Sequence, residues 1–212
     1  MSSDTLASLV PYLLVLAALG LFGVVYWKDH QRRDRAWREF AASRDWDITA
    51  SWNRWSIDGL HGRKRFQIRT EYIRRGSYTR GREYPYAVVS LELGEALPAM
   101  TRIRPEKLGR KVLKVFGKSD EEVGDAELDN AFELENLSDE VRAVLRTPDV
   151  RRQLLVLRSR FDSFSIEDTQ LTARHRGLPN SVATLEALVT PALQLSDALD
   201  QAVEGRRERR PG

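Results

Sequence analysis

The sequence predicts an α+β protein: an N-terminal transmembrane helix, a largely antiparallel β domain of about seven strands, and a C-terminal helix. Three observations indicate this class. Residues 6–27 carry no charged side chain, residues 47–93 contain several short runs rich in β-branched and aromatic residues, and residues 181–203 repeat leucine and alanine at helical spacing. The expected organisation is a tail at 1–5, the membrane helix at 6–27, a juxtamembrane helix at 28–45, an α+β globular domain at 46–204 and a basic disordered tail at 205–212.

The uncharged segment sets the first element. As a helix, residues 6–27 would be about 33 Å long, enough to cross a hydrocarbon core of about 30 Å. The segment ends in Tyr26 and Trp27, which is typical of the aromatic belt at a membrane interface. A cleaved signal peptide is the minority interpretation, because only Asp4 and no basic residue precedes the segment. A buried core helix is disfavoured, because the segment is apolar on every side.

The basic residues around this segment predict its orientation. No lysine or arginine precedes it, and five follow it closely. The positive-inside bias then places the N-terminus outside and the C-terminal domain in the cytoplasm, as a single-pass protein of the bacterial inner (plasma) membrane. The absence of cysteine agrees with a reducing compartment. The five basic residues are Lys28, Arg32, Arg33, Arg35 and Arg38.

Alternation of apolar and polar residues predicts the sheet. It is clearest over 64–73 and 84–93, which are joined by a long hairpin loop at 74–82. A sheet followed by one C-terminal helix is similar to the pleckstrin-homology-like barrel, a likeness of fold that implies no function. The expected strands cover 47–52, 55–61, 64–73, 84–93, 131–137, 161–166 and 170–175, with 100–104 as one more.

Prolines and a serine mark the helices of the domain. Pro105 is expected to open a helix that ends at Gly117. Ser138 is expected to cap a short helix, and Pro148 to begin another. Pro191 is expected to kink or split the final helix over 181–203.

A group of motifs lies between residues 103 and 134. A proline-led helix is followed by a Gly-Asp pair, an acidic-hydrophobic pair and a phenylalanine-led strand; a leucine-rich helix and a hairpin over 161–174 come next. The motif residues are Gly124 and Asp125, Leu128 and Asp129, and Phe132. On these motifs the sequence resembles, over roughly residues 30–176, a family of uncharacterised bacterial proteins with one N-terminal membrane span and a domain of unknown function. The resemblance implies membrane attachment and supplies no functional residue.

A basic hairpin is the first candidate site. Eight basic residues lie between 61 and 82 against one acid, Glu71, with Phe66, Tyr72 and Tyr78 among them. Arginine suits bidentate phosphate contacts, and beside a membrane the nearest phosphates belong to anionic lipids. A solvated face balanced by the acidic segment is an equally good interpretation, and nucleic acid ranks well below both. The candidate anion- or lipid-binding residues are Arg63, Lys64, Arg65, Arg69, Arg74, Arg75, Arg80 and Arg82.

An acidic segment is the second candidate. Residues 119–140 hold ten acidic and no basic side chains. A calcium loop counted from Asp120 would place Gly124 at position five and Ala131 at position twelve, so the required pattern fails. We expect no metal and no cofactor, and an acidic loop that balances the basic hairpin in the same molecule or a neighbour.

Four tryptophans lie just beyond the uncharged segment. We expect them to pack in the core between the juxtamembrane helix and the first strands; a face that dips into the membrane is the alternative. They are Trp37, Trp46, Trp52 and Trp55.

Catalytic motifs are absent from the sequence. It has no cysteine, its three histidines are isolated, and no phosphate-binding loop occurs. The expected function is a non-catalytic binding or scaffold module that contacts the lipid bilayer through residues 6–27 and engages anionic lipid or a partner protein. The alternative is a membrane-anchored enzyme whose arginine and carboxylate site is assembled only by the fold. The sequence predicts no oligomeric state.

Overall fold

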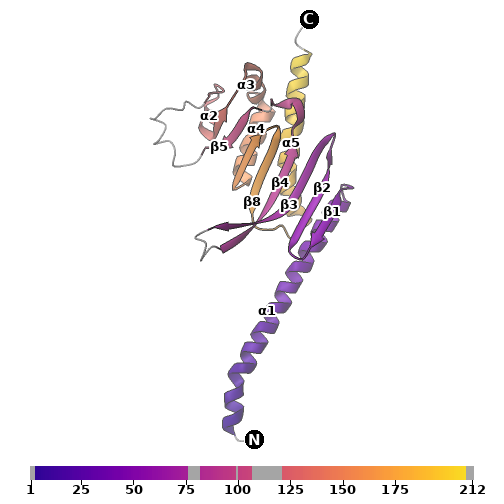
Figure 1. The fold of residues 1–212 in the computed structure, drawn as a ribbon, viewed down its shortest axis with the longest axis vertical. Helices are drawn as coiled ribbons and strands as arrows, with labels where there is room; N and C mark the ends of the chain where they lie inside the picture. The colour runs from indigo at the N-terminus through magenta and orange to yellow at the C-terminus, as the bar shows by residue number, and fades with distance from the viewer. Residues whose placement is uncertain (1–2, 76–81, 99, 107–120, 209–212) are drawn as a thin grey trace.

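One eight-stranded sheet, with helices, makes up the fold (Figure 1). The structure is a computed structural model and describes residues 3–75, 82–98, 100–106 and 121–208. The first half contains α1 (Ser3–Ala42), β1 (Asp47–Ser51), β2 (Arg54–His61), β3 (Lys64–Arg75), β4 (Arg82–Glu92) and the 3-10 turn η1 (Gly94–Ala96). The second half contains β5 (Arg102–Pro105), α2 (Ala126–Ala131), β6 (Phe132–Glu135), α3 (Asp139–Leu145), α4 (Pro148–Arg160), β7 (Ser163–Glu167), β8 (Gln170–Arg176) and α5 (Val182–Arg207).

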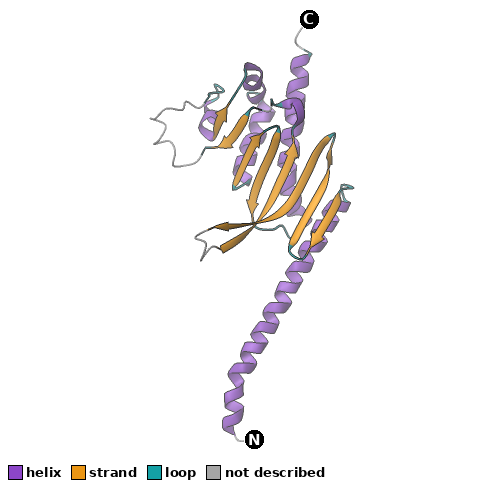
Figure 2. Ribbon diagram, viewed as in Figure 1, coloured by secondary structure: helices purple, strands orange, loops and turns teal. Residues whose placement is uncertain are grey.

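The strand order explains the shape of the sheet. The order is β1-β2-β3-β4-β8-β7-β5-β6, and every neighbouring pair is antiparallel. The prediction of an α+β fold with an antiparallel sheet is confirmed. The order has two ends, at β1 and β6, so the described strands form an open sheet and the expectation of a closed barrel is wrong. Figure 2 shows the sheet in front, with α4 and α5 behind it.

Period-two alternation directs the core residues towards these helices. Trp55 and Ile57 of β2 are buried, as are Phe66 and Ile68 of β3, whereas the residues between them are partly or fully exposed. Burying a large apolar side chain contributes about 1.5–3 kcal/mol, so this shared layer holds the sheet and helices together. The stripe of α5 that packs on it contains Leu185, Leu188, Ala192, Leu195 and Leu199.

Helix α1 corrects the prediction for the N-terminus. Among the residues that the structure describes, none of the helices combines the length and the apolar composition needed to cross a membrane. The predicted transmembrane helix over 6–27 is therefore wrong. The apolar side chains that are described on α1 run from Leu14 to Trp27. That stretch is about 21 Å long as a helix, shorter than a hydrocarbon core of roughly 30 Å.

Instead of two helices, one 40-residue helix runs through the predicted boundary near Lys28. Its C-terminal part belongs to the core, where Trp37 and Phe40 are completely buried. The indole nitrogen of Trp37 donates to the carbonyl of Pro179 at 3.2 Å, which fixes α1 against the segment that leads into α5. Figure 1 shows the N-terminal part of α1 projecting away from the sheet.

Local sequence signals predicted the starts of α3 and α4 correctly but missed α2 and the extent of α5. Ser138 accepts a hydrogen bond from the Val141 amide at 3.3 Å and caps α3, and Pro148 begins α4, as expected. Helix α5 passes through Pro191 as one helix and continues to Arg207, into the predicted tail. Helix α2 lies where only an acidic loop was expected. The helix predicted from Pro105 to Gly117 falls largely outside the described residues.

Candidate functional site

The turn between β1 and β2 carries an unusual tryptophan. Ser51 pairs with Arg54, so Trp52 and Asn53 form a two-residue turn. Trp52 has a φ of 28° and a side chain that is 77% exposed. Left-handed backbone suits glycine or asparagine, and a bulky residue there stores about 1–3 kcal/mol of strain. The turn therefore combines an exposed indole with backbone strain.

Asn53 fixes this turn to α1. Its side-chain amide nitrogen donates to the Tyr26 hydroxyl at 2.9 Å. Its backbone carbonyl accepts from the Tyr72 hydroxyl of β3 at 3.1 Å. Burial raises the pKa of Tyr72, so this hydroxyl stays a donor at neutral pH. The turn, α1 and β3 therefore meet at the level of Tyr26, where α1 leaves the domain.

Aromatic rings extend the contact along α1. His30 lies 6.0 Å from Trp52 and 5.4 Å from Trp55, measured between ring centroids. The Trp55 indole donates to Asp34 at 3.1 Å, and Arg38 donates to the same carboxylate at 2.8 Å. The hydrogen bond from Arg38 holds the pKa of Asp34 below its usual value. These contacts make the junction between α1 and the sheet a rigid unit.

Beyond this junction, α1 presents large apolar side chains to solvent on all sides. Phe22 is 73% exposed, and Tyr26 and Trp27 end the segment. Trp52 lies beside them, next to His30, so three exposed aromatics mark the place where the apolar surface meets the charged domain. We call the exposed residues of α1 the apolar segment: Leu14, Val15, Leu16, Leu19, Leu21, Phe22, Val24, Val25, Tyr26 and Trp27.

The tryptophans predicted to share one environment divide into two groups. Trp37 and Trp55 are buried in the core, and Trp46 is half-buried with its ring stacked on Phe66 at 4.5 Å. Trp52 alone of these four faces solvent. Core packing is therefore confirmed for Trp37 and Trp55, and the exposed alternative describes Trp52.

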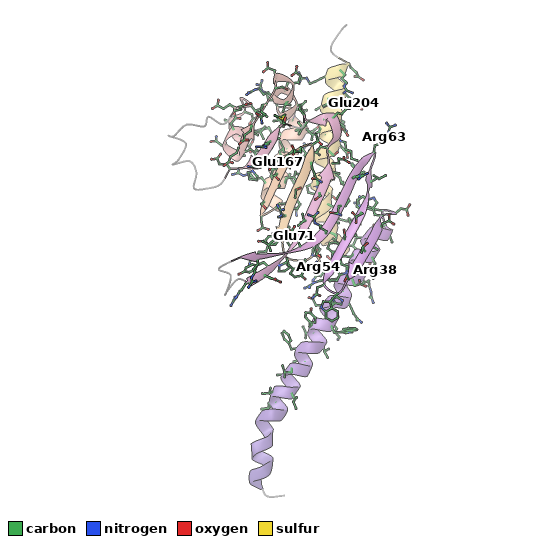
Figure 3. The ribbon with its side chains drawn as sticks, viewed as in Figure 1. Arg38, Arg54, Arg63, Glu71, Glu167 and Glu204 are labelled. Carbon is green, nitrogen blue, oxygen red and sulfur yellow. The ribbon has the colours of Figure 1, made fainter. Side chains whose placement is uncertain are left out.

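The predicted basic residues are spread along β3 and β4 instead of forming one cluster. Figure 3 places Arg63 at the end of the sheet that is farthest from the projecting part of α1. Lys64, beside it, donates to Asp200 of α5 at 2.7 Å and to Ser196 at 2.9 Å. Arg65 is exposed next to it, and Arg69 lies in the middle of the sheet. The described backbone of Arg74, Arg75 and Arg82 belongs to the hairpin end that extends on the side of α1, and Arg80 lies outside the described residues.

Arginine and carboxylate groups do come together on the open face of the sheet. Gln67 donates to Asp58 at 2.6 Å and accepts from Arg69 at 2.6 Å. The Oε2 atom of Glu71 lies 3.9 Å from Nη2 of Arg69 and 3.9 Å from Nε of Arg174. These groups come from β2, β3 and β8 and interact with one another on an open surface, an arrangement that suits a stable polar face.

The acidic segment has partners other than the basic hairpin. Asp125 caps α2 by accepting from the amides of Glu127 and Leu128, and its other oxygen pairs with Arg151 of α4 at 3.0 Å. Glu121 pairs with Arg142 of α3 at 3.0 Å. Within the molecule these residues therefore balance arginines of α3 and α4, and the expectation that they balance the hairpin of the same molecule is wrong for them.

Sequence reasoning did not single out Trp52 and Asn53 as a site. One signal was present: a Trp-Asn pair between two predicted strands, where Asn favours a left-handed turn. It also used the basic residues of α1 only for orientation. Their spacing, with Lys28, Arg32 and Arg35 at i, i+4 and i+7, was visible in the sequence.

No family model and no curated protein matches the chain, so the family resemblance based on residues 30–176 stays a prediction. A solved structure of the mycobacterial trehalose monomycolate transport factor A is similar over 78% of this chain and 93% of its own, at 12% sequence identity and a TM-score of 0.45.

Proposed function

We propose that this protein is a non-catalytic binding module that sits on a lipid bilayer. The apolar segment of α1 and the indole of Trp52 are its contact with the lipid. The observation that carries the proposal is Trp52: a large apolar side chain, 77% exposed and strained, held by Asn53 beside the point where α1 leaves the domain. Such strain persists where function requires the side chain.

The transfer free energy of the exposed apolar side chains favours lipid, rather than protein, as the partner of the apolar segment. Transferring one large apolar side chain from water into an apolar medium is favourable by about 1.5–3 kcal/mol. The segment exposes such side chains around the whole helix, whereas a protein partner would cover one stripe. Tyr26, Trp27 and Trp52 are the residue types that settle at the headgroup level, with the ring in the lipid and the polar atom in water.

The charged residues near the apolar segment also favour lipid contact on this side of the domain. Lys28 follows Trp27, Arg54 lies two residues after Trp52, and the hairpin end of β3 and β4 extends on the same side of the sheet (Figure 1). Cationic side chains near an anionic leaflet add about 1 kcal/mol each within a Debye length. The cytoplasmic leaflet of a bacterial inner membrane is the proposed location, because that leaflet is anionic.

Vesicle flotation of the full chain tests this function. The protein is purified in detergent and mixed with neutral phosphatidylcholine vesicles. The detergent is then removed, and the fraction of protein that floats with the vesicles is measured. We expect the wild type to float, and a Leu19→Glu/Phe22→Glu variant to lose at least tenfold in its partition coefficient, because charge on the lipid-contacting surface is costly.

Leu60→Glu is the matched control. Leu60 of β2 is 61% exposed and Leu19 is 63% exposed, but Leu60 lies on the sheet. Its substitution is expected to leave flotation unchanged. A wild type that stays in the lipid-free fraction, or a control variant that loses as much binding as the α1 variant, contradicts the proposal.

A further inference from the structure

Three cations of α1 form no ion pair with any residue that the structure describes. Lys28, Arg32 and Arg35 are exposed and lie on one side of the helix, at i, i+4 and i+7. Two neighbours, Arg33 and Arg38, form ion pairs with Asp29 and Asp34. Within the part of the chain that the structure describes, no carboxylate lies within ion-pair distance of these three cations. The helix therefore separates paired arginines from an unpaired basic stripe.

This stripe borders a cavity. An open cavity of about 530 Å³ lies between α1 and the start of α5. Ala36 and Trp37 of α1 are buried here, and the bond from Trp37 to Pro179 fixes the two helices relative to each other. The backbone on both sides of the cavity is thus held in place, and the exposed Lys28, Arg32 and Arg35 side chains line it. Its lining residues are Lys28, Gln31, Arg32, Arg35, Ala36, Glu39, Asn180, Ser181 and Val182.

The cavity is electrostatically suited to an anion. Three cations line it against a single acid, Glu39. The 26-residue helix α5 begins at its wall with no acidic residue in the first turn, so the helix dipole adds positive potential in the same direction. Arginine presents a planar fork that matches two oxygens of a phosphate, and lysine adds a point charge.

The position of the cavity indicates which phosphate reaches it. Lys28 follows Trp27, the last residue of the apolar segment. Measured along α1, Arg32 is about 7.5 Å beyond Trp27. The headgroup layer of a bilayer is about 5–8 Å thick on each side of the hydrocarbon core. A long arginine side chain extends this reach towards the lipid. With the apolar segment in lipid, the Lys28 end of the cavity lies at the depth of the headgroup phosphates. Arg35, about 12 Å beyond Trp27 along α1, reaches back towards that depth because helical side chains lean towards the N-terminus.

We propose that the cavity between α1 and the start of α5 binds the phosphate of an anionic lipid headgroup through Lys28, Arg32 and Arg35. This rests on the proposed function, because the apolar segment brings the cavity to the lipid. It assigns the headgroup contact to α1 rather than to the sheet hairpin. A phosphodiester lipid of the phosphatidylglycerol type is the expected ligand.

The test compares how strongly the full chain partitions into phosphatidylglycerol-containing and into pure phosphatidylcholine vesicles. The wild type is expected to prefer the anionic vesicles. An Arg32→Gln/Arg35→Gln variant is expected to lose about thirtyfold of that preference, and to bind neutral vesicles like the wild type. An Arg158→Gln/Arg160→Gln variant removes the same charge from exposed positions at the end of α4 and is expected to keep the preference.

Other outcomes would contradict the site, the ligand or the proposed function, as follows. If the Arg158/Arg160 variant loses as much preference as the Arg32/Arg35 variant, net charge rather than the cavity is responsible and the site is wrong. If inorganic phosphate binds the wild type but the Arg32→Gln/Arg35→Gln variant keeps the wild-type preference for anionic vesicles, the ligand is free phosphate and the lipid assignment is wrong. A wild type that binds both vesicles equally overturns this site alone, and one that binds neither overturns the proposed function with it.

Discussion

Gly59 of β2 lies directly against the indole ring of Trp46. A Cβ atom on Gly59 would stand 2.3 Å from Cδ1 of that ring. Trp46 is held in this position by stacking on Phe66 at 4.5 Å and by its indole nitrogen, which donates to the Leu60 carbonyl at 3.2 Å. The close approach joins the end of α1 to the first strands, so the residue without a side chain is required at position 59.

Gly59→Ala is therefore expected to destabilise the fold. The indole has to leave its position, at a cost of about 1–3 kcal/mol in the free energy of unfolding. Urea denaturation followed by circular dichroism measures it. Gly205→Ala in α5 is the control, because no atom lies within 4 Å of the added methyl group and alanine favours the helix by about 0.5–1 kcal/mol. Equal midpoints for wild type and Gly59→Ala would show that Trp46 moves freely.

Lys64→Met tests whether this basic residue serves the fold or the membrane. Its ammonium group donates to both carboxylate oxygens of Asp200 and to Ser196, 132 residues away in the sequence. Losing these charge-assisted bonds is expected to cost about 1–2 kcal/mol of stability. Partition into anionic vesicles is expected to stay unchanged. Arg63→Gln, in the adjacent turn, is the control and should alter stability by less than about 0.5 kcal/mol.

Asp34→Asn is expected to change the acid dependence of stability. The hydrogen bond from Arg38 lowers the pKa of Asp34 below 3.8 in the folded protein, so the folded state binds fewer protons than the unfolded state. The carboxylate's contribution is present above pH 3.8 and is lost as the pH falls through the lowered pKa. The difference in unfolding free energy between wild type and variant should thus be larger at pH 6 than at pH 3, measured by urea titration. A difference that is independent of pH would contradict this account.

Trp52→Gly separates stability from lipid contact. Glycine relieves the left-handed strain at this turn, so stability is expected to rise by about 1 kcal/mol. The same substitution removes one exposed aromatic side chain from the interface, and partition into neutral vesicles is expected to fall severalfold. Thermal unfolding and flotation, done on the same preparation, give both values. A variant that is less stable than the wild type would show that Trp52 is a packing residue.

Local sequence signals predicted much of the fold. The strands over 64–73 and 84–93 and the starts of α3 and α4 depend on alternation, a serine cap and a proline, each of which acts within a few residues. Contacts distant in sequence could not be read in this way. Lys64 meets Asp200 only because α5 packs against β4, the neighbour of β3, and Arg151 meets Asp125 only because α4 packs against α2. A prediction based on charge alone therefore assigned Lys64 to a lipid site and paired the acidic segment with the hairpin.

The candidate site shows the same limit. Trp52 and Trp55 are three residues apart and look equivalent in the sequence, but the turn between β1 and β2 sends one to solvent and the other into the core. The basic stripe of α1 was visible as spacing. The cavity beside it required the start of α5, which is separated from it by about 150 residues of chain.

The continuity of α1 fixes a rotational angle. One unbroken helix carries Phe22 in the apolar segment and Trp37 and Phe40 in the core. No break in the helix therefore separates Phe22 from Trp37, and rotating the apolar segment about its axis rotates the sheet by the same angle. The edge strands β1 and β6 are therefore held at fixed angles around the α1 axis.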